Sequence, residues 1–103
     1  MSTEITVIDA RDAIRDEGDS LQLIDVRSKV EFESDSINGF INIPLSELSM
    51  RISDLSGNKR TLLICKDGNM SHQALALLEA TGFKGQVIRG GLKDWKKVIN
   101  LVS

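Results

Sequence analysis

One cysteine, Cys65, directly follows the nearly all-apolar run Thr61-Leu62-Leu63-Ile64. Such a run is typical of a buried central strand in a parallel sheet, and the next four residues, 66–69, have turn composition. A helical pattern follows, with a broad apolar face made by Ala74, Leu75, Leu77 and Leu78. Ligands of open α/β sheets bind beyond the carboxyl ends of the strands. The pattern therefore predicts a nucleophilic thiolate in a loop between a strand and a helix.

Three features are expected to favour the thiolate of Cys65 over the thiol. The backbone N–H groups of the loop can form an anion-binding nest, the helix beginning near Ser71 points its positive end at the sulfur, and Lys66 adds a nearby cation. A helix end contributes roughly 0.3–1 kcal/mol at an exposed site, so the nest has to supply most of the effect. We expect a thiolate that is cupped by main-chain amides and reachable from solvent.

Each of these residues also has a purely structural interpretation, which the sequence leaves open. Cys65 can be a small buried core residue, Ser71 an N-cap and Lys66 a solvated charge. His72, in the first turn of the predicted helix, is interpreted as a surface residue rather than a catalytic base. Trp95 is assigned to the core.

Composition limits the classes of function. The chain has 103 residues, of which 41% are hydrophobic and 27% charged, so we expect a single globular domain over residues 1–103. The formal net charge of −2 predicts no general attraction to nucleic acid or anionic lipid. A single cysteine excludes an internal disulfide and a multi-cysteine metal site, and we expect no metal.

The same features predict a location. A lone thiol suits a reducing compartment. The first twelve residues contain no apolar run of signal-peptide length, and no stretch approaches the roughly 20 apolar residues that span a bilayer. We therefore expect a cytoplasmic protein that does not contact a membrane.

Short apolar runs alternate with helical patterns along the whole chain. Strands are predicted at 5–8, 21–24, 40–43, 61–64 and 86–88. Helices are predicted from an N-cap at Asp9 toward Asp16, from a capping box at Ser28 and Glu31 through Glu33, and over 46–55, 71–81 and 92–101. In the last of these, Trp95, Val98 and Ile99 are expected to face inward. This alternation predicts an α/β fold with a mainly parallel sheet.

Several segments resemble the signatures of rhodanese-like domains. The first signature is matched by 23–27 (Leu-Ile-Asp-Val-Arg), 31–32 and 37–44, the active-site loop by 65–71, and the closing pattern by 82–83, Val87 and 90–95. The resemblance extends from about Ile5 to Lys97 with the family's order and spacing. It implies a rhodanese-like fold, with a central mainly parallel sheet flanked by helices on both faces.

The resemblance also implies sulfurtransferase chemistry without a metal or an organic cofactor. The Cys65 thiolate would take the outer sulfur of thiosulfate or another persulfide donor and pass it to a thiol or cyanide acceptor. The expected substrate-binding residues are those of the loop, whose N–H groups would stabilise the persulfide: Lys66, Asp67, Gly68, Asn69, Met70 and Ser71. Arg27 is a further candidate anion ligand, with an ion pair to Asp25 or Glu31 as its structural alternative.

Three positions depart from the family in ways that bear on the donor. Two-domain thiosulfate enzymes carry cations where Glu31 and Asp67 stand, and two carboxylates near the entry path would repel a dianion. Met70 makes the rim softer and more apolar, which suits an organic or protein-borne persulfide. The expected partners are accordingly a small sulfur-donor anion or persulfide and a sulfur-acceptor protein. The oligomeric state stays open.

Two other functions compete with turnover of thiosulfate. The first is a persulfide carrier, or a rhodanese module for protein interaction, that turns over poorly alone. The second is a cysteine phosphatase or arsenate reductase. That chemistry needs an arginine six residues after the cysteine, to fork onto the phosphate. Ser71 occupies that position.

Overall fold

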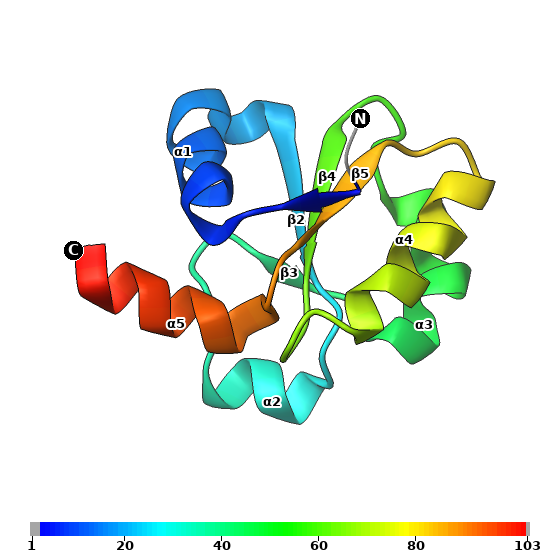
Figure 1. Cartoon of the computed structure of the whole chain (residues 1–103). Coiled ribbons are helices and arrows are strands. Elements are labelled where there is room, and N and C mark those ends of the chain that lie inside the picture. The colour runs from blue at the N-terminus through cyan, green and yellow to red at the C-terminus, as the bar shows by residue number, and fades with distance from the viewer. Residues whose placement is uncertain (1–2, 103) are drawn as a thin grey trace.

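The computed structural model describes residues 3–102 of the chain and contains a five-stranded parallel sheet (Figure 1). From one edge to the other the strands are β1 (Glu4–Ile5), β5 (Gly85–Ile88), β4 (Arg60–Ile64), β2 (Leu21–Asp25) and β3 (Ile41–Asn42). Every neighbouring pair is parallel. The predicted α/β fold is confirmed, and the strand that precedes Cys65 is the central one.

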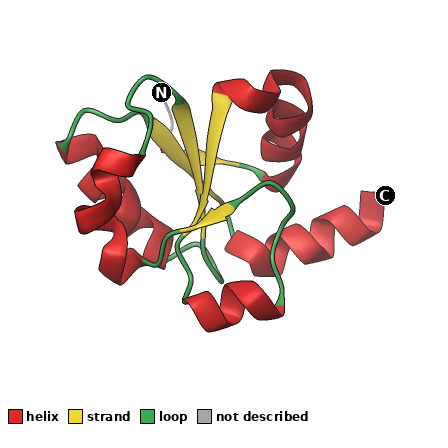
Figure 2. Cartoon of the chain, turned by 180° about the vertical axis from the view of Figure 1, so that it is seen from behind, coloured by secondary structure: helices red, strands yellow, loops and turns green. Residues whose placement is uncertain are grey.

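Helices cover both faces of this sheet, as predicted. They are α1 (Val7–Glu17), α2 (Lys29–Ser34), α3 (Leu45–Arg51), α4 (Met70–Ala80) and α5 (Gly91–Val102), with short 3₁₀ turns at Gly18–Ser20 and Ile52–Asp54. Helices α1 and α5 lie against one face and α3 and α4 against the other, while α2 lies beyond the carboxyl ends of the strands (Figures 1 and 2). Within residues 3–102, none of the helices has the length and apolar character needed to cross a bilayer.

The two faces of β4 supply two separate parts of the core. Leu62 and Ile64 belong to the cluster beneath α1 and α5, whereas Leu63 and Cys65 belong to the cluster beneath α3 and α4. This division follows from the two-residue period of a strand, in which successive side chains point to opposite faces. Cys65 therefore lies on the α3–α4 side, at the carboxyl end of the sheet.

The N-terminal prediction is partly wrong. Val7 and Ile8 were assigned to a strand, but α1 already begins at Val7, and β1 contains only Glu4 and Ile5. Thr6 is the N-cap, since its side chain accepts a hydrogen bond from the backbone N–H of Asp9 at 3.1 Å. Asp9 therefore supplies the amide and not the cap.

In the middle of the chain the predicted elements are present, although two of them are shorter than predicted. The capping box between Ser28 and Glu31 is present at the start of α2. The helix predicted over 46–55 is the shorter α3 followed by a 3₁₀ turn at Ile52–Asp54, and the extended segment predicted at 40–43 forms only the two-residue β3. Trp95, Val98 and Ile99 pack against the core as expected.

Candidate active site

Cys65 immediately follows β4, and two main-chain amides point at its sulfur. Its Sγ accepts hydrogen bonds from the N–H of Gly68 at 3.1 Å and of Ser71 at 3.4 Å. Two of the expected amides thus donate to the sulfur. The expectation that the sulfur is reachable from solvent is wrong, because Cys65 is only 1% exposed and belongs to the apolar cluster under α3 and α4.

Two carbonyl groups at the start of the loop are directed toward α5. Cys65 O accepts a hydrogen bond from Leu92 N at 2.7 Å, and Lys66 O accepts one from Lys93 N at 3.0 Å. The first N–H groups of a helix have no partner within the helix, so the loop satisfies two donors of α5. In return, α5 fixes the orientation of the loop.

Glycines at both sides of this contact make the close approach of the loop and α5 possible. Gly91 has φ +63°, and a Cβ atom at that position would lie 2.5 Å from Cys65 O. Gly68 has φ +96°, and its Cβ would lie 3.0 Å from Gly90 N. In the sequence, Gly90 and Gly91 stand directly before the pattern of the last helix. Two consecutive glycines in that position are a signal that a backbone approaches closely there.

The start of α4 differs from the prediction in its cap. Ser71 is a candidate N-cap in the sequence, but α4 begins at Met70, and its N-cap, Asn69, makes no side-chain capping bond. Ser71 lies inside the first turn, where its free N–H donates to the sulfur of Cys65. The sulfur therefore occupies the place of a capping acceptor, at the positive end of the helix.

The hydroxyl group of Ser71 is buried, and within the described part of the chain its Oγ has no hydrogen-bond partner. A buried polar atom that lacks a partner costs roughly 1–3 kcal/mol. A hydroxyl can rotate and can donate as well as accept. This group is thus available to an atom added at the sulfur.

The other loop residues form an exposed rim. Lys66, Asp67, Asn69 and Met70 are exposed, with Met70 at 44%. The N–H of Asn69 donates to Asp67 Oδ1 at 3.1 Å, so it is not directed at the sulfur. We expected N–H groups from Lys66 through Ser71 to surround the sulfur. Those of Gly68 and Ser71 are the two that hydrogen-bond to Sγ in the described structure.

Arg27 is held by a buried carboxylate. Its Nη2 lies 2.9 Å from Asp25 Oδ2, its Nε lies 3.1 Å from both carboxylate oxygens, and its backbone N–H donates to Asp25 Oδ1. Asp25 is 1% exposed. Glu31, the alternative partner, is engaged by Ser28 in the capping box. This geometry favours the structural interpretation of Arg27.

Asn42 ties this ion pair to the sheet, which the sequence analysis did not foresee. Its Nδ2 donates to the backbone carbonyl groups of Asp25 at 3.0 Å and of Arg27 at 2.9 Å. The only signal in the sequence was a polar side chain inside the apolar run 40–43.

His72 binds to the edge of the sheet and is exposed, as predicted for a surface residue. Its Nε2 lies 3.0 Å from Glu4 Oε2, and Arg89 Nε lies 3.3 Å from Glu4 Oε1. The hydrogen bond from His72, assisted by Arg89, holds the pKa of the Glu4 carboxyl below its ordinary value of 4.5. The contact links β1 to the first turn of α4.

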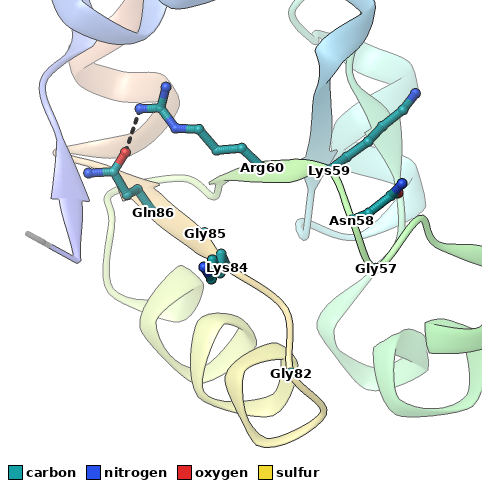
Figure 3. A pocket seen from close by; sticks show the side chains of 8 residues that line it. All are labelled: Gly57, Asn58, Lys59, Arg60, Gly82, Lys84, Gly85 and Gln86. Carbon is teal, nitrogen blue, oxygen red and sulfur yellow. Dashed lines mark hydrogen bonds between the residues drawn. The ribbon is translucent and has the colours of Figure 1, made fainter.

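A cavity of about 360 Å³ lies at the opposite end of the sheet, where β4 and β5 begin. Figure 3 shows its lining by residues 57–60, 82 and 84–86, including the hydrogen bond of 2.6 Å from Arg60 Nη2 to Gln86 Oε1. The strands are parallel, so this cavity and Cys65 are separated by the length of β4. The cavity is not part of the sulfur site.

Comparisons with known proteins agree on one family. The family model for the rhodanese-like domain matches residues 6–98. The chain is 35% identical over 81 residues to the putative sulfur carrier protein YrkF of Bacillus subtilis, covering 78% of this chain. It is 36% identical over 96 residues to the probable adenylyltransferase/sulfurtransferase MoeZ of Mycobacterium tuberculosis, covering 90% of this chain. The chain spans only 44% of YrkF and 24% of MoeZ.

Solved structures give the same result for the fold. A rhodanese-related protein from Thermoplasma volcanium superposes with a TM-score of 0.85 at 30% sequence identity, and the match covers 94% of this chain and 93% of that one.

The pairing of Arg27 with Asp25 generates a first prediction. Replacing Arg27 by Met leaves a buried carboxylate without its cation, and we expect the free energy of unfolding to fall by about 3–5 kcal/mol. Urea denaturation of the variant and the wild type measures this difference. The double variant Asp25→Leu/Arg27→Met, which buries no unpaired charge, should recover part of the loss. A loss below 1 kcal/mol in the single variant would contradict the structural role.

Proposed function

Because the chain belongs to the rhodanese-like domain family, we propose that it is a sulfurtransferase that carries a sulfane sulfur as a persulfide on Cys65. The observation that supports this most directly is the sulfur at the N-terminus of α4, with two amides donating to it. Such an environment favours an anionic sulfur, which is the form that attacks a donor and the form that a persulfide adopts.

In the proposed first half-reaction, the Cys65 thiolate attacks the outer sulfur of the donor. With thiosulfate, the new bond joins Sγ to that sulfur, the old sulfur–sulfur bond breaks, and sulfite leaves with the electron pair. In the second half-reaction, an acceptor thiolate or cyanide attacks the outer sulfur and Cys65 leaves as a thiolate. The amides of Gly68 and Ser71 stabilise the negative charge in both steps.

The Ser71 hydroxyl fits the same chemistry. It is buried in the first turn of α4 and has no partner within the described part of the chain. We infer that it donates to the persulfide once the second sulfur is present. Lys66 is exposed beside the cysteine and offers a cation to an incoming anionic donor.

A carrier that exchanges sulfur with other proteins, rather than turning over thiosulfate, is the second candidate. Two observations favour it. The side chain of Cys65 is only 1% exposed. In addition, the hydrogen bond from the N–H of Asn69 to Asp67 Oδ1 keeps the carboxylate of Asp67 at the loop. The phosphatase alternative has less support, since the position of its phosphate-binding arginine is held by the buried Ser71.

The proposal is tested by incubating the protein with thiosulfate or glutathione persulfide and measuring its intact mass. The wild type should gain one sulfur, which cyanide removes as thiocyanate. Cys65→Ser should gain none while keeping its circular dichroism spectrum, because it lacks the thiolate. Equal loading of the wild type and Cys65→Ser would refute the role of the cysteine. A stable gain of sulfur with negligible thiocyanate production would favour the carrier.

Ser71→Ala separates a functional hydroxyl from a structural one. The variant keeps the backbone N–H that donates to Sγ but loses the unpaired buried oxygen. We expect unchanged or higher stability, by up to about 1 kcal/mol, together with slower sulfur loading. Thermal unfolding and stopped-flow loading measure the two effects, and Ser71→Thr, which keeps the hydroxyl, serves as the control. Wild-type loading by the alanine variant would exclude the hydroxyl from the reaction.

The acidic rim predicts weak binding of thiosulfate. Asp67→Asn removes one negative charge but keeps an oxygen able to accept from Asn69 N, so the turn is preserved. We expect the KM for thiosulfate to fall about two- to fivefold at low salt, and the difference to shrink as ionic strength rises. Asp67→Lys should lower it further. Steady-state kinetics at two salt concentrations provide the test, and an unchanged KM in both variants would show that this carboxylate does not affect donor entry.

A further inference from the structure

One stripe of the exposed side of α4 carries no charged residue. Residues at helical spacing form one exposed stripe, which we call the α4 face: Met70, Gln73, Ala76, Leu77 and Ala80. Leu77 is 38% exposed and Met70 is 44% exposed. The titratable residues of the helix, His72 and Glu79, lie on the opposite flank of its exposed side. The helix contains no lysine or arginine.

Such a face is unusual for a helix that borders solvent. A surface helix normally carries charged or polar residues on its outer side, and a helix that is apolar all round is normally buried. Helix α5 follows the ordinary pattern, with Lys93, Lys96 and Lys97 exposed. On the neighbouring helix α3, Met50 is 75% exposed, next to the ion pair of Glu47 and Arg51. The pattern of α4 therefore indicates a surface that another molecule covers.

The α4 face is continuous with the sulfur site. Met70 is both the last residue of the exposed rim and the first residue of α4, and the next residue, Ser71, donates its N–H to Cys65 Sγ. A molecule that brings sulfur to Cys65 must approach this rim, because the cysteine side chain itself is 1% exposed. The rest of a large donor then lies over the α4 face.

We propose that the α4 face is the docking surface for a protein that carries its sulfur as a cysteine persulfide and delivers it to Cys65. This inference rests on the proposed function of Cys65. In the transfer, the Cys65 thiolate attacks the outer sulfur of the partner's persulfide, the partner's sulfur–sulfur bond breaks, and the partner departs as a thiolate. No oxidant or reductant is consumed.

Charge favours a protein donor over a free anion, and the size of the α4 face fits a brief contact. Asp67 places a carboxylate in the rim, which repels a small dianion but matters less to a neutral segment of a protein. The face is a single stripe on an eleven-residue helix. So small an apolar surface suits a transient encounter, in which the partner must leave after each transfer.

The test compares a protein donor with a small one. The protein donor is a cysteine desulfurase persulfidated on its own cysteine, and the small donor is glutathione persulfide. Leu77 lies about 10 Å along the helix from Met70, which places it beyond the reach of a small donor at the loop. We expect Leu77→Lys to slow loading from the desulfurase about tenfold and to leave loading from glutathione persulfide within about twofold of the wild type. Loading is followed by intact mass over time.

Two variants serve as controls. Leu77→Met keeps an apolar side chain and should load from both donors as the wild type does. Ile41→Lys makes the same change in charge at another exposed aliphatic residue, on the edge strand β3, two strands away from β4. It should also load normally from both donors. Thermal unfolding of all variants shows that each is folded.

The outcomes separate failure of the docking surface from failure of the proposed function. Equal desulfurase loading of the wild type and Leu77→Lys, or no loading of the wild type by the desulfurase, would overturn the docking proposal while leaving glutathione persulfide loading intact. If neither the desulfurase nor glutathione persulfide loads the wild type with sulfur, the proposed function itself is overturned. A wild-type dimer in sedimentation analysis that Leu77→Lys makes monomeric would assign the face to a second copy of the chain and overturn the inference.

Discussion

The sulfur site depends on the direction in which the carbonyl groups of Cys65 and Lys66 point. Both accept hydrogen bonds from the first turn of α5, at 2.7 and 3.0 Å. A carbonyl oxygen turned toward the sulfur would oppose an anion, so directing these two groups to α5 leaves the interior of the loop to N–H groups. The contact exists only because Gly91 lacks a Cβ, which would lie 2.5 Å from Cys65 O. The C-terminal helix thereby determines the electrostatic surroundings of a cysteine in the middle of the chain.

The same site carries energetic costs that a purely structural loop would avoid. The Ser71 hydroxyl is buried without a partner in the described structure. The positive φ angles at positions 68 and 91 favour glycine, and glycine loses more conformational entropy on folding than other residues do. These features lie within one loop and the two helix ends that contact it. Unsatisfied groups and special backbone conformations concentrate at functional sites, where the rest of the fold offsets them. In this chain the parallel sheet and the buried pair of Asp25 and Arg27 provide that support.

Local patterns were sufficient to predict most of the fold and the position of Cys65 between the central strand and a helix. The apolar run before Cys65 correctly indicated a central strand, and the capping box at 28–31 correctly indicated α2. The errors occurred where two local signals competed. Thr6 and Asp9 both have side chains that can cap a helix, and the structure uses Thr6, which accepts the N–H of Asp9. Serine is a common N-cap residue. In this helix, however, the sulfur of Cys65 is the acceptor for a free N–H of the first turn, that of Ser71. Contacts between distant segments, such as that of Gly91 with the loop, leave no periodic pattern in the sequence.

The burial of Cys65 beneath α4 determines how a donor can reach the sulfur. Cys65 lies at the boundary of the α3–α4 core cluster, so the helix that supplies its amide also covers it. Such a site restricts access by size, since a single sulfur atom needs far less room in the loop than a tetrahedral phosphate does. In the proposed reaction, the same burial would shield a persulfide on Cys65 from water and from free thiols. It would also slow the access of small donors, and a partner docked on α4 would offset this by holding its own sulfur at the exposed loop residues. On the proposed function, protection of the persulfide and reliance on a docked partner have the same cause.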